Sequence, residues 1–261
     1  MTVHLVGAGP GDPELLTVRA ARLIASADVV VYDALADRSI LELAPARAER
    51  IDVGKRPGRS TPQEMINALL IHLGTQHAHV VRLKGGDPYV FGRGGEEASA
   101  LQQAGIDFEV VPGISSAVGV PASAGIPVTH RGVSHAFTVV TGHREKGGAS
   151  GIDWESLARV GGTIVVLMGV TERAQIARRL MAGGLDASTP VAAIRYGTRK
   201  DQTTRRFPLG ALASEPLESP TTIVIGLANW MRPEPPPLPP AGPTRPPIPS
   251  TRPTAVAFSV P

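Results

Sequence analysis

The sequence predicts an α/β protein made of two α/β domains. In the first part of its 261 residues, short runs of Val, Ile and Leu alternate with segments of helical pattern. Continuous apolar strands separated by crossover helices are typical of a parallel sheet that is buried on both faces. The pattern is interrupted at Pro112-Gly113 by a segment rich in small residues, and strand and helix patterns then resume. We therefore predict an N-terminal domain at 1–112 and a C-terminal domain at 113–232, with enough chain for two cores.

The first domain reads as repeated strand–helix units. We expect helices where apolar residues recur at helical spacing and strands where they run on continuously. The predicted strands are 3–6, 28–32, 50–53, 78–83 and 108–111. The predicted helices are 13–26, 38–43, 62–74 and 94–104. Glu96 and Glu97 suit the first turn of the last of these helices, where the helix dipole favours acidic side chains.

The second domain begins with a segment, 114–125, that is rich in Gly, Ala and Ser and reads as a close-packed helix. A second helix is expected at 172–182, and strands are expected at 137–141, 163–168, 191–195, 203–207 and 222–226. The last three strands follow one another without a helix between them, which favours some antiparallel pairing. The segment 143–151 reads as a polar, glycine-rich loop.

The segment 233–261 differs from the rest of the chain, since 12 of its 29 residues are proline. Proline cannot donate a backbone hydrogen bond, so this composition predicts an extended, disordered tail. The tail is either a linker or terminus without a function of its own or a docking ligand for a partner domain.

Composition excludes several classes of protein. The sequence has no cysteine, which rules out disulfides and thiolate metal sites. The longest apolar run, 164–168, is too short to span a bilayer, and the glycine-broken first strand is unlike a signal peptide. We therefore expect a cytoplasmic protein with no membrane partner. The 22 Arg residues against 4 Lys are scattered, which argues against nucleic acid. Arginine binds carboxylate or phosphate through two hydrogen bonds, but base composition also explains the excess.

Two glycine-rich loops follow predicted strands and point to ligand binding. The first, VHLVGAGPGD at 3–12, resembles a dinucleotide loop, but Pro10 and Asp12 break the G-x-G-x-x-G pattern. The second, RLKGGDPYVFGRGGEE at 82–97, lets the backbone approach a ligand closely because glycine has no side chain. Its apolar residues, Tyr89, Val90 and Phe91, suit a ligand larger than a phosphate. Alternatively, the first loop is only a tight turn.

Acidic, basic and hydroxyl side chains stand after other predicted strands. Asp33 ends VVVYD and Lys55 lies in VGKR, so the two could handle protons at one edge of the sheet. Alternatively, Asp33 caps a helix or turn, and Lys55 is a surface lysine. Ser115 and Ser116 of VPGISSA either cap a helix or hydrogen-bond a ligand. Arg131 of IPVTHRG is a plausible anion clamp, and we expect no metal site at its neighbour His130.

Taken together in this order, the motifs resemble those of the uroporphyrinogen-III C-methyltransferases in the precorrin (tetrapyrrole) methylase superfamily. The resemblance covers about 2–231. It is carried by GAGPGD at 7–12, VVVYD at 29–33, VGKR at 53–56, the long block at 82–97, VPGISSA at 111–117, GIPVTHR at 125–131, VTGH at 140–143, LMG at 167–169 and YGT at 196–198.

The resemblance implies a fold of two α/β domains with the active site in the cleft between them, usually in a homodimer. It implies methylation of uroporphyrinogen III at C2 and C7 by two molecules of S-adenosyl-L-methionine (SAM). The products would be precorrin-2, formed through precorrin-1 for sirohaem or cobalamin synthesis, and S-adenosyl-L-homocysteine. No metal is implied.

The resemblance also implies a role for individual residues. Asp33 would be the proton acceptor and Lys55 the proton donor. Arg93 and Arg131 would bind substrate carboxylates, and Glu96 would either receive a pyrrole N–H or serve only its helix. The residues expected to hold SAM are Pro10, Gly85, Gly86, Asp87, Val90, Ser115, Ser116, Met168 and Gly197. The family usually has Thr-Ala where this chain has Ser115-Ser116, so the contact at Ser116 is expected through the backbone.

Three other functions remain to be tested. A sister methylase acting on a later precorrin would share the fold and the SAM loop, but the GRGGEE and THR blocks argue against it. A nucleotide-binding oxidoreductase is suggested by the first glycine loop and Asp33, although the glycine pattern is broken. A non-catalytic scaffold would use the proline-rich tail.

Overall fold

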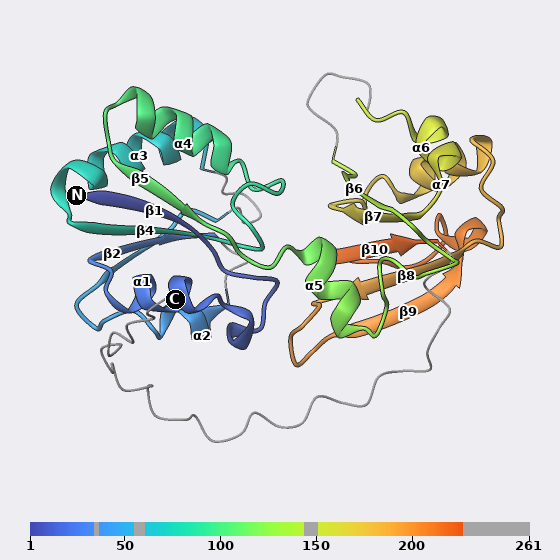
Figure 1. Cartoon of the computed structure of the whole chain (residues 1–261), viewed down its shortest axis with the longest axis horizontal. Helices are drawn as coiled ribbons and strands as arrows, with labels where there is room; N and C mark the ends of the chain where they lie inside the picture. Colours follow the sequence, from blue (N-terminus) through green and yellow to red (C-terminus); the bar gives the residue numbers. More distant parts are fainter. Residues whose placement is uncertain (34–36, 55–60, 144–150, 227–261) are drawn as a thin grey trace, which may run out of the picture.

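The computed structural model describes residues 1–33, 37–54, 61–143 and 151–226. They form two five-stranded sheets, each covered by helices (Figure 1). The first sheet has the order β3-β2-β4-β1-β5 and the second β6-β7-β10-β8-β9. The prediction of two α/β units is therefore confirmed. Lys55, most of the predicted loop at 143–151 and the proline-rich tail lie outside the described residues.

The first sheet is parallel throughout, as predicted. Its strands are β1 (Thr2–Gly7), β2 (Val29–Tyr32), β3 (Glu49–Asp52), β4 (His79–Lys84) and β5 (Phe108–Val111). The helices α1 (Val18–Ala25) and α2 (Arg38–Leu41) cover one face, and α3 (Gln63–Gln76) and α4 (Gly94–Gln103) cover the other (Figure 1). Each face has its own apolar core: Ile24 and Ile40 pack against Val30 on one side, and Leu70 and Leu101 against Leu5 on the other.

The second sheet mixes two kinds of pairing. The strands β6 (Phe137–Thr141) and β7 (Thr163–Leu167) are parallel, whereas β8 (Pro190–Arg195), β9 (Thr203–Pro208) and β10 (Thr221–Ile225) pair antiparallel. The antiparallel pairing expected here is confirmed. One face is covered by α5 (Ser116–Ser123), and the other by α6 (Trp154–Val160) and α7 (Arg173–Ala182) (Figure 1).

Some predicted element bounds were wrong, and local capping explains the differences. The helix expected at 13–26 is split into a 3₁₀ turn, η1 (Pro13–Leu15), and α1, because Thr17 caps α1 by accepting the Ala20 N–H at 3.1 Å. The helix expected at 114–125 begins only at Ser116. The helix α6 was not predicted, although Asp153 caps it by accepting the Ser156 N–H at 3.0 Å.

The course of the chain marks one edge of the first sheet for ligand binding. The strands β1 and β2 lead to helices on one face, whereas their neighbour β4 leads to α4 on the opposite face. Ligands of open α/β sheets bind beyond the carboxyl ends of strands at such a switch point. The strand β5 then leads through a short connection to α5 in the second unit, and the domain division that we predict after residue 112 falls in this connection.

Candidate functional site

Glycines bring the backbone segments at the switch point into direct contact. Gly9 and Gly86 pair in an antiparallel bridge, with N···O distances of 3.1 and 2.7 Å. A Cβ atom on Gly7 would lie 2.5 Å from the Cα of Gly113, so no side chain fits there. The loops after β1, β4 and β5 therefore meet through their main chains, which leaves backbone groups close to any ligand bound beside them.

Asp87 ties the loop after β4 to the connection that leads into the second domain. Its Oδ2 accepts the Gly113 N–H at 3.0 Å, and its Oδ1 accepts the Tyr89 N–H at 2.8 Å. Gly85 and Gly86 stand between this carboxylate and the end of β4. Asp87 therefore has a clear structural role in shaping the loop, beside the ligand contact that the sequence predicts.

Candidate residues from both domains gather around the first turns of α5. A Cβ on Gly86 would lie 3.7 Å from the Ser116 nitrogen, and one on Gly119 would lie 3.0 Å from Cγ of Pro10. Gly197 packs so closely on α5 that a Cβ there would lie 2.3 Å from Cγ1 of Val120. The group comprises Pro10, Gly86, Ser115, Ser116 and Gly197. The structure thus brings together five of the nine residues predicted to hold SAM, at the junction of the two sheets.

The two serines differ in their local role. Ser115 is the N-cap of α5, and its Oγ accepts the Ala117 N–H at 3.2 Å. The capping alternative for Ser115 is therefore confirmed. Ser116 is the first residue of the helix, with its nitrogen and Oγ facing the position where Gly86 lacks a side chain.

Two other predicted SAM residues lie on exposed turns. Met168 follows β7 with φ of 55° and a relative exposure of 52%. It lies beside Gly142, where a Cβ would be 3.2 Å from the Met168 carbonyl oxygen. Val90 belongs to the turn after β4, and its N–H donates to the Asp87 carbonyl at 3.3 Å. Both side chains are open to a ligand, but neither has a described contact with the group around α5.

Strained backbone accompanies this site. Tyr196 and Thr198, which flank Gly197, have φ of 50° and 68°. Non-glycine residues persist in this region only where their surroundings hold them, and such residues cluster at functional sites. Thr198 is held by the first domain, since its Oγ1 accepts the Asp12 N–H at 3.1 Å. Nearby, Arg199 forms an ion pair with Asp37 at 3.2 Å, which also links the two domains.

A chain of four charged side chains runs from the edge of the sheet into the protein. Arg82 Nη2 donates to Asp33 Oδ1 at 2.7 Å, and Arg82 Nε donates to Glu97 Oε1 at 3.1 Å. Lys84 Nζ donates to the same Glu97 oxygen at 2.8 Å. Burial, with help from the neighbouring Arg82 charge, holds the pKa of Lys84 below its usual range. Asp33 therefore ends an ion-pair chain, and Asp37 is the residue that caps α2.

The predicted substrate residues lie on exposed segments. Arg93 has φ of 59° and precedes α4, and its Nε and Nη2 each donate to a carboxylate oxygen of Glu96 at 2.7 Å. This pair lowers the pKa of Glu96 and raises that of Arg93. Arg131 is exposed on a turn closed by the bridge between His130 and Ser134.

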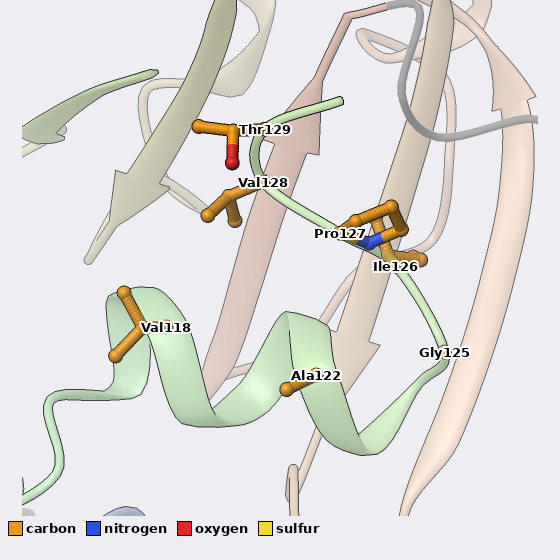
Figure 2. A pocket seen from close by; sticks show the side chains of 7 residues that line it. All are labelled: Val118, Ala122, Gly125, Ile126, Pro127, Val128 and Thr129. Carbon is orange, nitrogen blue, oxygen red and sulfur yellow. The ribbon is translucent and has the colours of Figure 1, made fainter. Parts of the chain in front are cut away.

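A cavity of about 430 Å³ lies between α5 and the segment that leads to Arg131 (Figure 2). Val118 and Ala122 belong to the helix, and the Val128 side chain extends from the following segment toward the helix. Its lining residues are Val118, Ala122, Gly125, Ile126, Pro127, Val128 and Thr129. None of them is a predicted site residue, so this cavity and the group around α5 are lined by different residues.

Sequence reasoning did not single out Arg82, Lys84 and Gln63, which contact Glu97 in the charged chain that ends at Asp33. Gln63 donates to Glu97 Oε1 at 3.3 Å, next to Arg82 and Lys84. A signal was present: Arg82 and Lys84 stand two residues apart in a strand that reads as buried, so both point to the same face. Buried charges are rare unless they are paired, and this pattern predicts acidic partners on the covering helices.

Within the described ranges, no three His, Asp or Glu side chains are grouped so that they could hold a metal ion. The same ranges hold no helix with the length and apolar character needed to cross a bilayer.

Comparisons with known proteins identify the class to which this fold and site belong. Residues 2–213 match the family of tetrapyrrole (corrin/porphyrin) methylases, and the chain belongs to that family. The crystal structure of uroporphyrin-III C-methyltransferase from Thermus thermophilus, in complex with S-adenyl homocysteine, superimposes with a TM-score of 0.77 at 43% identity. The match covers 87% of this chain and 98% of the Thermus thermophilus chain. The predicted fold is confirmed.

Individual relatives narrow the class. The S-adenosyl-L-methionine-dependent uroporphyrinogen III methyltransferase of Methanosarcina barkeri is 56% identical over 81% of this chain and 83% of its own. The uroporphyrinogen-III C-methyltransferase of Priestia megaterium is 46% identical over 86% of this chain and 96% of its own. This chain covers only 48% of the siroheme synthase of Chromobacterium violaceum, at 49% identity. The resemblance to uroporphyrinogen-III C-methyltransferases is therefore confirmed.

Proposed function

We propose that this protein methylates uroporphyrinogen III at C2 and C7 with SAM and gives precorrin-2 through precorrin-1. One observation carries the proposal: the chain aligns with 96% of the Priestia megaterium uroporphyrinogen-III C-methyltransferase at 46% identity. That alignment includes both domains, so it covers the residues from each domain that meet around α5. S-adenosyl-L-homocysteine would be the second product.

The residues around α5 fit SAM. A Cβ on Gly86 would lie 3.7 Å from the backbone nitrogen and 4.0 Å from the hydroxyl oxygen of Ser116, so the space beside Gly86 is free of protein atoms at closer range. Backbone and hydroxyl groups of this kind suit the amino, carboxylate and ribose groups of SAM, which carries a methyl group already activated by its sulfonium. Gly85, Gly86 and Asp87 would hold it from the first domain, and Ser115, Ser116, Met168 and Gly197 from the second, with Pro10 and Val90 beside it.

The protein's own contribution is position and proton transfer. The sulfonium of SAM already activates the methyl group, so a strong Lewis acid is not required. Fixing a pyrrole carbon in line with the methyl group lowers the entropic part of the barrier. A proton must leave the macrocycle after methylation. Asp33, part-exposed at the switch point and held by Arg82, is the acceptor that we propose. Lys55 as proton donor remains a prediction, since it lies outside the described residues.

The carboxylates of the tetrapyrrole need cationic partners, and Arg93 and Arg131 are exposed arginines that could supply them. A guanidinium binds a carboxylate through two parallel hydrogen bonds, which fixes orientation as well as affinity. Arg93 already holds Glu96 in this way, so substrate binding at Arg93 competes with Glu96 unless Glu96 turns to a pyrrole N–H.

The rival functions have less support. The structure of a cobalt precorrin-4 methyltransferase matches with a TM-score of 0.78 but only 24% identity, which shows the shared fold alone. An NAD-dependent oxidoreductase would need a helix N-terminus for the pyrophosphate directly after β1. Here Asp12 stands there and caps η1 by accepting the Glu14 N–H at 2.9 Å. Calorimetry with SAM and with NAD separates these two functions.

The direct test is anaerobic incubation of the protein with SAM and uroporphyrinogen III, followed by mass analysis. Two added methyl groups support the proposal. One methyl group, or turnover only with a later precorrin, would redirect the protein to another methylase reaction. No turnover with any tetrapyrrole would favour the scaffold. That it works as a homodimer in the cytoplasm is also a proposal, which rests on the family resemblance, and light scattering tests the dimer.

A further inference from the structure

We propose that Arg82 is a positioning residue whose guanidinium holds the Asp33 carboxylate in the orientation in which it accepts the substrate proton. This rests on the proposed function of Asp33. Tyr32 pairs with Leu83 across β2 and β4, so Asp33 emerges from the sheet beside the end of β4. Arg82 Nη2 reaches Asp33 Oδ1 at 2.7 Å from a side chain that is only 2% exposed.

The guanidinium of Arg82 is itself fixed on its other sides. Its Nε donates to Glu97 Oε1 at 3.1 Å, and its Nη1 donates to the Leu83 carbonyl at 3.3 Å. The planar fork of arginine presents these donors in a rigid arrangement that lysine lacks. With Nε and Nη1 both engaged, the plane of the guanidinium is fixed, and its Nη2 faces Asp33.

Glu97 is in turn held by three donors. Its Oε1 accepts hydrogen bonds from Arg82, from Lys84 at 2.8 Å and from Gln63 at 3.3 Å. These donors come from β4 and α3, while Glu97 belongs to α4. The orientation of Asp33 is thus connected to a strand and two helices, and each of these elements packs in the apolar core of that face.

Stability alone is a poor explanation for these charges. Taking an ion out of water costs several kcal/mol, and buried ion networks are often no more stable than apolar side chains of the same size. In this network Arg82, Lys84 and Glu97 are at most 2% exposed, and the Oε2 atom of Glu97 has no hydrogen-bond partner among the described residues. Asp33 is the member that solvent reaches, at 30% exposure. The network therefore ends at a carboxylate that a substrate can contact.

The test is a double-mutant cycle of Arg82→Lys and Asp33→Asn in the full-length protein. We expect Arg82→Lys to lower kcat by roughly 10- to 100-fold and to leave the affinity for SAM unchanged. This loss is smaller than the loss expected for Asp33→Asn, because the carboxylate is still present but less well oriented. If Arg82 acts through Asp33, adding Arg82→Lys to Asp33→Asn lowers kcat by no more than about twofold further, the usual error of additivity. The matched control is Arg179→Lys. Arg179 lies in the second domain, where its Nε donates to Glu155 Oε1 at 2.8 Å. The kcat of the Arg179→Lys variant should equal that of the wild type.

The outcomes are distinct. If the two effects multiply in the double mutant, Arg82 acts independently of Asp33, and the inference is overturned. If Asp33→Asn alone keeps wild-type kcat, the proposed role of Asp33 fails first, and the inference falls with it. Should Arg82→Lys melt below the assay temperature, Arg82→Gln replaces it, because Lys84 still pairs with Glu97 at 2.8 Å in that variant. The same lack of additivity with Asp33→Asn is then expected, and multiplied effects again overturn it.

Discussion

Gly9 and Gly86 hydrogen-bond to each other in both directions, with N···O distances of 3.1 and 2.7 Å, although 76 residues separate them in the sequence. The pair joins the loops beyond β1 and β4, the two strands at the switch point of the first sheet. Both residues have positive φ, 71° and 69°. Glycine is needed here because other residues rarely adopt this conformation and would fill the adjacent space.

Gly86→Val should abolish SAM binding while the protein still folds. The valine side chain would occupy the space next to Ser115 and Ser116. Valine held at the φ of 69° that Gly86 has would also cost about 1–3 kcal/mol in strain. Calorimetry measures the affinity and thermal melting the stability.

The matched control for this change is Gly105→Val. Gly105 has the same φ of 69°, but a Cβ there meets nothing within 4 Å. It should lower the melting temperature by a similar amount and leave SAM affinity intact. If Gly86→Val keeps its SAM affinity, the space beside Gly86 is not the SAM site. If Gly105→Val loses SAM binding as well, the loss is not specific to that space.

Gly197→Ala should destabilise the protein by about 1–3 kcal/mol, the usual cost of overpacking. The new methyl group would lie 2.3 Å from Cγ1 of Val120 and push α5 away from the segment after β8. In a Val120→Ala background the same change should cost less, because the two nearest methyl groups are gone and only the Cβ of residue 120, at 2.8 Å, remains in the way. Denaturant unfolding of the four proteins gives the coupling. Equal costs in both backgrounds would show that the strain arises elsewhere.

Asp33→Asn should bind SAM as the wild type does and turn over on the order of 10²–10⁴-fold more slowly. The amide keeps the shape of the carboxylate but does not act as a base. Steady-state kinetics with uroporphyrinogen III, together with calorimetry for SAM, test this. Turnover near the wild-type rate in a folded variant would remove Asp33 from the mechanism.

Arg131→Ala should weaken tetrapyrrole binding by about 10- to 150-fold and spare SAM, since a charge-assisted hydrogen bond contributes roughly 1.5–3 kcal/mol. Arg178, exposed on α7, provides the control, and Arg178→Ala should bind both ligands normally. A parallel loss of SAM affinity in Arg131→Ala would point to a disturbed fold rather than to a lost carboxylate contact.

Arg93→Ala should raise the pKa of Glu96 toward its ordinary value of 4.5, because the hydrogen bonds from Arg93 are the main cause of the lowered pKa. A carboxylate with a lowered folded-state pKa stabilises the fold above its unfolded pKa, and this contribution is lost as pH falls through the folded value. The pair is exposed, so the effect on stability is small. NMR titration of the Glu96 carboxyl measures the shift; an unchanged pKa would mean that the pair does not persist in solution.

Local patterns were enough to predict most of the fold. Apolar runs and helical spacing located the ten strands within a residue or two, since each depends on side chains close in sequence. The helix at 13–26 was wrong because Thr17 provides a cap inside a segment whose apolar spacing looks continuous. Helix α6 was missed for the converse reason, a cap at Asp153 before a short helix.

The sequence by itself determined the α/β class, the loops of glycine after strands, and the family to which these motifs point. Each of these follows from neighbouring residues and their spacing. It also placed Asp33 and the glycine block at strand ends, and parallel strands gather their carboxyl ends at one edge.

Tertiary structure alone decided which residues meet at that edge. Arg82 lies 49 positions from Asp33 and 15 from Glu97, and only strand order and helix packing bring the three together. Likewise, Gly197 contacts Val120 because α5 packs on the face of the sheet to which β8 contributes apolar side chains. Such contacts join residues far apart in the sequence, so no local pattern encodes them; the burial of the apolar faces of sheets and helices sets them.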